Sequence, residues 1–244
     1  MCVSAQASTH ESDMRPHALR GEVLYTAGRW REAIEAYSPL LQASAAAATP
    51  PPLTTFLHLA SAYQQLGKPQ YALDVYLQAC VQQPCASVWL GVGKARMELG
   101  ETAAAEAALS KAVALDPESP VGWGHLATVA LKLGRVQEAG AALSTALRFG
   151  LRDVGTLQHL ARGFSAAGSV ADVRVCLEAV VAIPGSAVTT RIALAELLMN
   201  EHDVAAARLH LEAAARAAAT DEEVAAVHAL VPRLIDLQMQ LRTC

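Results

Sequence analysis

The sequence predicts an all-α protein, a right-handed α-solenoid of about six helix pairs followed by a C-terminal capping helix. Hydrophobic residues make up 53% of the chain, and much of this share is alanine, the strongest helix former, whereas aromatic residues contribute only 5%. Similar residues also recur at a fixed period, and glycines and prolines fall where helices would end and begin. Together these observations favour thin, closely packed helices in a repeating array.

The period is 34 residues. This step separates Trp89 from Trp123, and it joins Gly100, Gly134 and Gly168. A repeat of this length, with small and aromatic residues at fixed offsets, is typical of tetratricopeptide helix pairs. The pattern is strongest over residues 53–153 and weaker toward both ends, as terminal repeats often are.

Small and large residues alternate at fixed positions of the repeat. Small residues are expected where the two helices of a pair, A and B, cross closely, and large residues are expected to fill the spaces between neighbouring helices. The small positions include Gly93, Ala105, Ala127 and Ala139, and the large ones Tyr63, Tyr76, Trp89 and Trp123. Gly100 and Gly134 suit the end of helix A, and Pro69 suits the first turn of helix B.

Five segments follow from the repeat pattern. We expect a flexible N-terminus over residues 1–13, a first helix pair over 14–41 and an Ala/Pro-rich hinge over 42–52. Repeats two to six then occupy residues 53–221. Thr220 and Glu223 have capping-box spacing, so we expect a C-terminal capping helix over residues 222–244, kinked or restarted near Pro232.

Composition and charge exclude several classes of function. Nineteen Lys and Arg against twenty-three Asp and Glu give a net charge of −4, with no clustered basic track for nucleic acid. No apolar stretch is long enough to span a membrane, and residues 1–17 lack the apolar core of a secretory signal. We therefore expect a soluble, cytoplasmic protein.

The five cysteines do not form a recognisable framework. Cys2, Cys80, Cys85, Cys176 and Cys244 include no CxxC pair and have no histidine at zinc-ligand spacing. We interpret them as reduced structural thiols. A disulfide between Cys80 and Cys85, the one close pair, stays open as the alternative.

One segment goes beyond the general repeat pattern. The runs Tyr76-Leu77-Gln78-Ala79-Cys80 and Trp89-Leu90-Gly91-Val92-Gly93, with Pro84 between them, resemble the C-terminal repeat region of a cilia- and flagella-associated protein of the axonemal central apparatus. The similarity continues through Ala104–Ser110, Ala114-Leu115, Trp123, Leu131–Arg135 and Glu138-Ala139. The resemblance implies a structural role in the axoneme of a motile cilium or flagellum, within a large hetero-complex of axonemal subunits.

The sequence offers no catalytic constellation, so we expect neither an enzyme nor a bound cofactor or metal. His202 and His210 are eight residues apart and could share a helix face with Glu201, but they have no third ligand. Gly91, Gly93 and Gly100 lack the lysine and the strand context of a phosphate-binding loop. Two alternatives to the axonemal role stay open: a non-ciliary cytoplasmic tetratricopeptide adaptor in complex assembly or trafficking, and an enzyme subunit in which the repeats only dock a partner.

The candidate binding surface is the concave groove, which the A helices of tetratricopeptide proteins line. Its predicted side chains are mainly apolar, which favours an amphipathic helix or an extended segment of another protein as the ligand. The Lys/Asn/Arg clamp for a chaperone carboxylate is absent, since the corresponding positions of the first repeat hold Ala18 and Glu22. The same residues could instead simply pack against the neighbouring repeat. They are Leu57, Gln64, Leu90, Lys94, Met97, Thr128, Leu131, Arg162, Ile192 and Met199.

Overall fold

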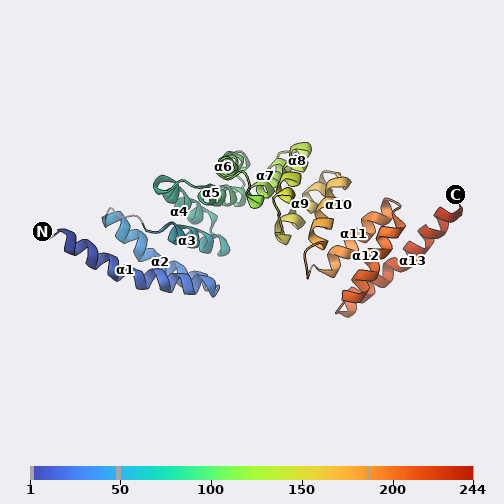
Figure 1. The fold of residues 1–244 in the computed structure, drawn as a ribbon, viewed down its shortest axis with the longest axis horizontal. Coiled ribbons are helices and arrows are strands. Elements are labelled where there is room, and N and C mark those ends of the chain that lie inside the picture. The colour runs from blue at the N-terminus through green and yellow to red at the C-terminus, as the bar shows by residue number, and fades with distance from the viewer. Residues whose placement is uncertain (1–2, 48–50, 186, 244) are drawn as a thin grey trace. The chain divides into compact units, whose positions relative to one another are not determined.

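The computed structural model describes residues 3–47, 51–185 and 187–243. These residues form thirteen α-helices, with no strand among them, which confirms the predicted all-α tetratricopeptide-type fold (Figure 1). The chain divides into two compact units, Met1–Val129 and Ala130–Cys244, with the boundary inside α7 (Pro120–Lys132). We describe each unit by itself.

Unit 1 contains three complete helix pairs and most of α7. Each helix contacts the next along the chain from α1 to α6, and the A helices α1 and α5 both contact the A helix α3. The pairs are α1 (Val3–Thr26) with α2 (Trp30–Ala47), α3 (Leu53–Gln65) with α4 (Pro69–Gln82), and α5 (Ala86–Glu98) with α6 (Thr102–Leu115).

Unit 2 contains the end of α7 and the remaining helices. The last helix, α13, packs on both members of the preceding pair and buries Val227, Leu230 and Leu234 against it. The other helices are α8 (Val136–Arg148), α9 (Val154–Ala166), α10 (Val170–Val181), α11 (Val188–Asn200), α12 (Val204–Ala217) and α13 (Asp221–Thr243).

The small positions of the repeat are buried as expected. Ala105, Ala127 and Ala139 have no exposed surface. Gly93 lies so close to helix α6 that a Cβ atom placed on it would be 2.5 Å from Leu109 Cγ. Glycine and alanine therefore set the separation of the helices at these crossings.

The helix ends follow the predicted chemistry. Gly100, Gly134 and Gly168 have φ of 79°, 74° and 75°, the left-handed conformation that ends helix A. Before α13, the Thr220 hydroxyl accepts a hydrogen bond from the Glu223 N–H (3.2 Å), and the Glu223 carboxylate accepts one from the Thr220 N–H (3.2 Å). This confirms the capping box. Hydrogen bonds from the Ala219 and Thr220 N–H groups to the Glu223 carboxylate lower the pKa of Glu223.

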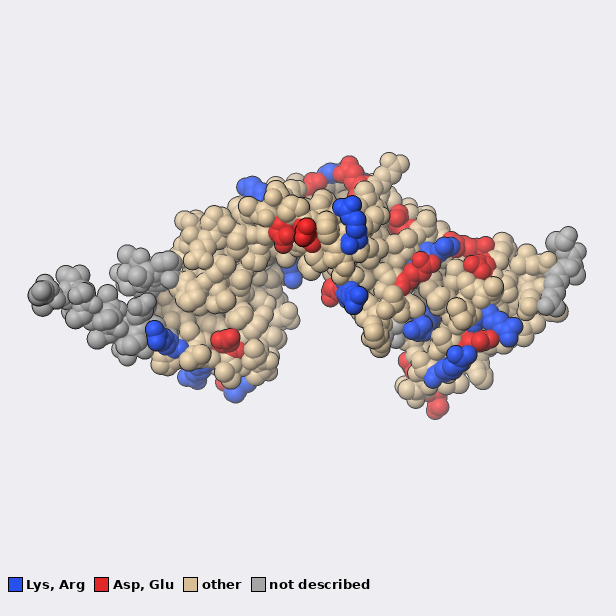
Figure 2. Space-filling model, in the orientation of Figure 1, with Lys and Arg blue, Asp and Glu red and all other residues tan. Residues whose placement is uncertain are grey.

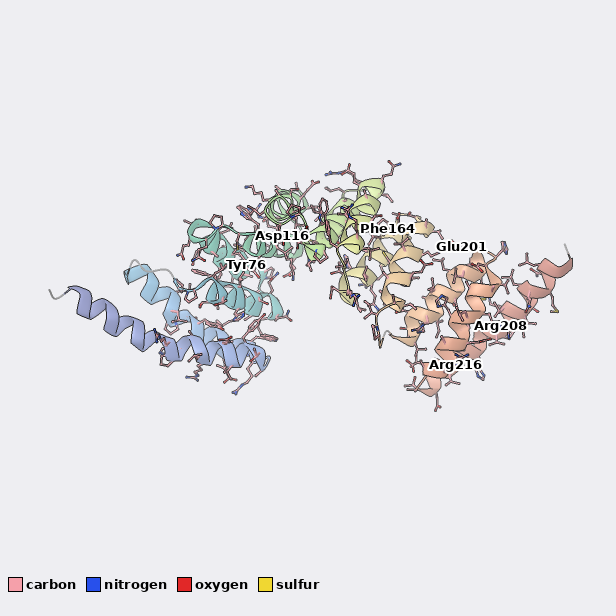
Figure 3. The ribbon with its side chains drawn as sticks, in the orientation of Figure 1. Tyr76, Asp116, Phe164, Glu201, Arg208 and Arg216 are labelled. Carbon is pink, nitrogen blue, oxygen red and sulfur yellow. The ribbon has the colours of Figure 1, made fainter. Side chains whose placement is uncertain are left out.

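Three of the four large side chains are less buried than expected. Tyr76, labelled in Figure 3, is buried as predicted, but Tyr63, Trp89 and Trp123 are only partly buried. The Lys111 ammonium lies over the outer face of the Trp89 ring, 4.3 Å from its centroid, and the Trp123 indole N–H donates to the Pro117 carbonyl (2.8 Å). Trp89 packs against the core of unit 1 while part of its ring stays exposed, and Trp123 is likewise partly exposed.

The segment boundaries at the N-terminal end differ from those expected. Helix α1 begins at Val3, where a flexible terminus was expected, and α2 continues to Ala47, into the expected hinge. Residues 48–50 of that hinge lie outside the described part of the chain, so the hinge stays a prediction. At the other end, α13 runs as one helix through Pro232.

Candidate protein-binding surface

Five of the predicted binding residues lie on two neighbouring A helices of unit 1. Leu57 and Gln64 belong to α3, and Leu90, Lys94 and Met97 belong to α5, which contacts α3. All five side chains are partly buried, so each retains some surface outside the core. We call these five residues the unit 1 A-face.

A chain of hydrogen bonds orders the polar part of the unit 1 A-face. The Tyr76 hydroxyl of α4 donates to Gln64 Oε1 (3.1 Å), and Gln64 Nε2 donates to Glu98 Oε1 of α5 (2.8 Å). Partial burial raises the pKa of Glu98, while the Gln64 bond and the Lys94 charge oppose this shift. Gln64 therefore couples three helices and presents an amide whose orientation is already fixed.

The apolar part of the same face has two roles. Leu90 and Met97 pack against a cluster formed by Ala105, Leu109 and Val129, and still expose part of each side chain. The alternative in which these residues pack within the protein is therefore correct for their inner surfaces. Their outer surfaces remain partly exposed on the helix that also carries Lys94.

Thr128 and Met199 lack the exposure that the predicted groove requires. Thr128 is 3% exposed, and its hydroxyl donates to the Gly124 carbonyl of its own helix (3.1 Å). Met199 is 4% exposed and lies in the same apolar cluster as Val227 and Leu230 of α13. Helix α13 packs on α11 and shares the cluster that contains Met199. Since both Thr128 and Met199 are buried, neither offers a side-chain surface to a partner.

The remaining predicted residues belong to unit 2. Leu131 is partly buried, and its Cδ1 atom lies 2.7 Å from where a Cβ atom of Gly163 would be, which shows how closely α7 and α9 approach. Ile192 packs at the edge of the α11–α13 core. Arg162 of α9 is exposed.

Sequence reasoning missed an aromatic and polar cluster that joins the first helix pair to α3. The Tyr25 ring stacks on the His58 imidazole, with centroids 4.3 Å apart, and its hydroxyl donates to Ser61 Oγ (3.0 Å). The Tyr37 hydroxyl lies 3.0 Å from His58 Nδ1, and burial, the Glu22 charge and Tyr25 raise the pKa of Tyr37 to about 12. Because these partners lie in different repeats, one repeat's pattern does not reveal them.

Other kinds of site find little support in the described residues. No group of three metal-ligating side chains is found there, and none of these helices has the length and apolar character needed to cross a bilayer. Burial raises the pKa of Cys176 to about 12, and that of Cys80 also rises, so both thiols stay protonated and unreactive. A shallow depression of about 440 Å³ beside α12 and α13 is lined by Val204, Ala205, Arg208, Gln238 and Leu241.

Charges are interspersed over the visible face of the molecule, where Figure 2 shows acidic and basic side chains near one another. Several form ion pairs within unit 2. Arg174 bonds both Glu178 (3.0 Å) and Glu201 (3.1 Å), and Arg208 bonds Glu212 (2.8 Å).

Comparison with known proteins points to one family. The model of the cilia and flagella-associated protein 70 C-terminal domain matches residues 2–230. Cilia- and flagella-associated protein 70 from Homo sapiens is 37% identical over 105 residues, which is 43% of this chain and 9% of the human protein. The protein of the same name from Macaca fascicularis gives the same identity over the same length, 10% of its own chain. The match thus spans about a tenth of these relatives.

Solved structures share the fold. Pseudomonas aeruginosa PilF superimposes with a TM-score of 0.63 at 17% identity, covering 90% of this chain and 98% of that one. A tetratricopeptide repeat protein from Parabacteroides merdae gives a TM-score of 0.58 at 18% identity, covering 96% of this chain and 89% of that one. MamA gives a TM-score of 0.54 at 24% identity, covering 65% of this chain and 93% of MamA.

Proposed function

The chain belongs to the cilia and flagella-associated protein 70 C-terminal domain family, and from this premise we propose that it is a non-catalytic protein-interaction scaffold of the motile ciliary axoneme, located in the central apparatus. The family match over residues 2–230 is the observation that carries the proposal. The names of the curated relatives support the cilium or flagellum as its location. The resemblance around Cys80 and Trp89 supports the central apparatus.

The unit 1 A-face is the proposed docking surface for another axonemal subunit. It combines an apolar floor, formed by Leu57, Leu90 and Met97, with the positioned amide of Gln64 and the charge of Lys94. A tetratricopeptide array binds helices or extended segments through such mixed surfaces, and apolar anchors near their centres contribute most of the binding energy. The ligand that fits is an amphipathic segment with an acidic residue opposite Lys94.

The test is co-sedimentation of the purified chain with salt-washed axonemes, with the Lys94→Glu variant measured beside wild type. Lys94 is only partly buried, so the charge reversal should leave the melting temperature within a few degrees while recovery falls several-fold. Arg31→Glu on the B helix α2 is the matched control, because Arg31 is exposed and the substitution makes the same charge change on another helix of unit 1.

Two outcomes would count against the proposal. If wild type stays in soluble cytoplasmic complexes and never sediments with axonemes, the chain is instead an adaptor outside the axoneme. If wild type sediments and Lys94→Glu behaves like Arg31→Glu, the axonemal role stands but the unit 1 A-face is not the docking surface.

A further inference from the structure

The first and the last of the described helices each keep an exposed apolar stripe. Helix α1 exposes Leu19 and Val23, one turn apart, at 63% and 66%. Helix α13 exposes Val224, Val231 and Ile235, at 40%, 41% and 49%. The spacing of these three, seven and then four residues, places them on one face of the helix. We call the two sets the α1 stripe and the α13 stripe.

The position of each helix in the array accounts for its stripe. Within unit 1, α3 packs on both helices of the pair before it, α1 and α2, and α5 packs in the same way on α3 and α4. In unit 2, α13 packs on α11 and α12, so it takes the place of an A helix (Figure 1). Among the described residues no further pair follows α13, and no helix precedes α1. Each stripe is therefore on an A helix that lacks one neighbour of the array.

The charges near the α13 stripe are mainly negative. Residues 221–241 hold four carboxylates and one arginine. Asp221 and Asp236 are both exposed, and their separation of fifteen residues, close to four turns, places them on the same side of the helix. Arg233 lies nine residues after Val224, two and a half turns, and so on the opposite side of the helix from that stripe residue.

The charges near the α1 stripe are mainly positive. Residues 15–26 of α1 hold two arginines and one glutamate. Arg15 lies four residues before Leu19, and Arg20 lies three residues before Val23, spacings that make each arginine a neighbour of a stripe residue on the helix surface. Both arginines are exposed. The two stripes thus match in apolar character and are opposite in charge.

We propose that the α13 stripe of one copy of this chain docks on the α1 stripe of a second copy, which joins the copies head to tail. The contact pairs two A helices, as α1 with α3 and α11 with α13 are paired within the chain. Removal of apolar surface from water drives the association, and the opposite charges select the partner helix. This self-association goes beyond the proposed scaffold function and does not depend on it.

Pairing of like stripes fits the charges less well. In an antiparallel pair of α13 helices related by a twofold axis, the same edge of each helix meets its copy. The edge that carries Asp221 and Asp236 would then face the same acidic edge of the second copy, and like charges across an interface repel. The contact between α13 and α1 joins unlike charges instead.

Sedimentation velocity of the purified chain tests the contact, over a range of about 1–100 μM that covers Kd values of micromolar order. The average mass of wild type should rise with concentration. Leu19→Glu/Val23→Glu disrupts the α1 stripe, and Val231→Glu/Ile235→Glu disrupts the α13 stripe. Each variant alone should self-associate at least about tenfold more weakly than wild type, since apolar anchors contribute most of the binding energy.

A mixture of the two stripe variants identifies which surfaces meet. The α1-stripe variant keeps its α13 stripe, and the α13-stripe variant keeps its α1 stripe, so one copy of each can still join through an intact contact. The mixture should therefore form a dimer with one copy of each variant, and no larger species. Its affinity should lie within about twofold of that of wild type, because the substitutions are distant from the intact contact.

The matched control is Leu77→Glu/Val81→Glu on α4. These two residues are also apolar, exposed and one turn apart, so the control adds the same charge to another surface of unit 1. It should self-associate within about twofold of wild type, since exposed charges at a distance are screened. Circular dichroism melts establish that each variant is folded.

Exchanged charges provide a second test that leaves both apolar stripes intact. Arg15→Glu/Arg20→Glu should weaken self-association several-fold, because it turns the charges near the α1 stripe negative like those near the α13 stripe. Adding Asp221→Arg/Asp236→Arg to the same chain should restore most of the affinity, since both sides of the contact are then reversed.

Four results would overturn the inference. Wild type that remains a monomer throughout the concentration range excludes the contact. Equal weakening by Leu77→Glu/Val81→Glu and by the stripe variants would show nonspecific apolar association. Undiminished self-association of either stripe variant alone would show that like stripes pair with each other. A mixture of the stripe variants that stays monomeric would show that the α1 and α13 stripes do not bind one another.

Discussion

Replacing Gly93 with alanine should destabilise unit 1, although alanine is the better helix former. In a helix interior the substitution alone would stabilise by about 1 kcal/mol. Here the new Cβ atom would lie 2.5 Å from Leu109 Cγ and 2.6 Å from its Cδ2. Leu109 has no exposed surface and packs against Ala105 and Val129, so it has little room to turn away.

The expected magnitude follows from these opposing effects. Overpacking a well-filled core costs about 1–3 kcal/mol, which exceeds the helix-propensity gain and leaves a net loss of about 1 kcal/mol. For a chain of this size, that loss corresponds to a melting temperature lower by about 2–4 °C. Thermal melts followed by circular dichroism provide the measurement.

Gly155→Ala is the matched control. Gly155 lies in the first turn of the A helix α9, and an added Cβ atom would meet only Asp153 Oδ2 at 3.6 Å, an ordinary contact. This substitution should stabilise by about 0.5 kcal/mol through the lower entropy of the unfolded chain. Equal melting temperatures for wild type and Gly93→Ala, or a higher one for Gly93→Ala, would refute the close crossing of α5 and α6.

Three further predictions concern stability. Trp89→Ala should lower the free energy of unfolding by about 2 kcal/mol, less than the 3–5 kcal/mol typical of a fully buried indole, because the ring is partly exposed beneath Lys111. A denaturant titration measures this loss, and a value below about 1 kcal/mol would mean that the ring is not packed against the core. His202→Gly should stabilise by about 0.5–1 kcal/mol by relieving a left-handed backbone with φ of 63°, and a lower melting temperature would contradict this. The pKa of His159 in the folded protein lies below its ordinary value of 6.5, so the unfolded chain takes up its proton first and stability falls as the pH drops below 6.5. His159→Gln should therefore lose less stability than wild type between pH 7 and pH 5 in paired urea titrations; identical losses would show that this histidine does not contribute.

The helix pairs could be predicted because the repeat constrains them locally. The same period relates Trp89 to Trp123, the glycines at helix ends and the small residues at helix crossings. This agreement determines closely where each helix begins and which of its residues face the partner helix. The structure bears this out at Ala105, Ala127 and Ala139, all fully buried. Contacts between repeats, such as that of Tyr25 with His58 and Ser61, depend on pairs of residues far apart in sequence and have no periodic signature.

The candidate binding surface could be predicted less well, because exposure depends on the neighbours of each repeat. Gln64, Met97, Leu131 and Met199 occupy the same position of four repeats, yet the first three are partly exposed and Met199 is buried. The difference arises because α13 packs on α11 and shares the cluster that contains Met199. Repeat position thus predicts which way a side chain points, and the next element in the stack decides whether it remains accessible.

His202 shows how strongly the repeat imposes its geometry on an unsuitable residue. The step that joins Gly100, Gly134 and Gly168 next reaches position 202, where a histidine takes the same left-handed conformation. The backbone bonds are preserved, since the His202 N–H donates to the Met199 carbonyl (3.1 Å) and the Asp203 N–H to the Leu198 carbonyl (2.9 Å). The left-handed conformation of His202 costs about 1–2 kcal/mol. This cost is offset by those backbone bonds, by the Asp203 cap on α12 and by the packing of α13 on both helices of the pair. The sixth pair thus keeps the geometry of the repeat at a position where its sequence departs from the pattern.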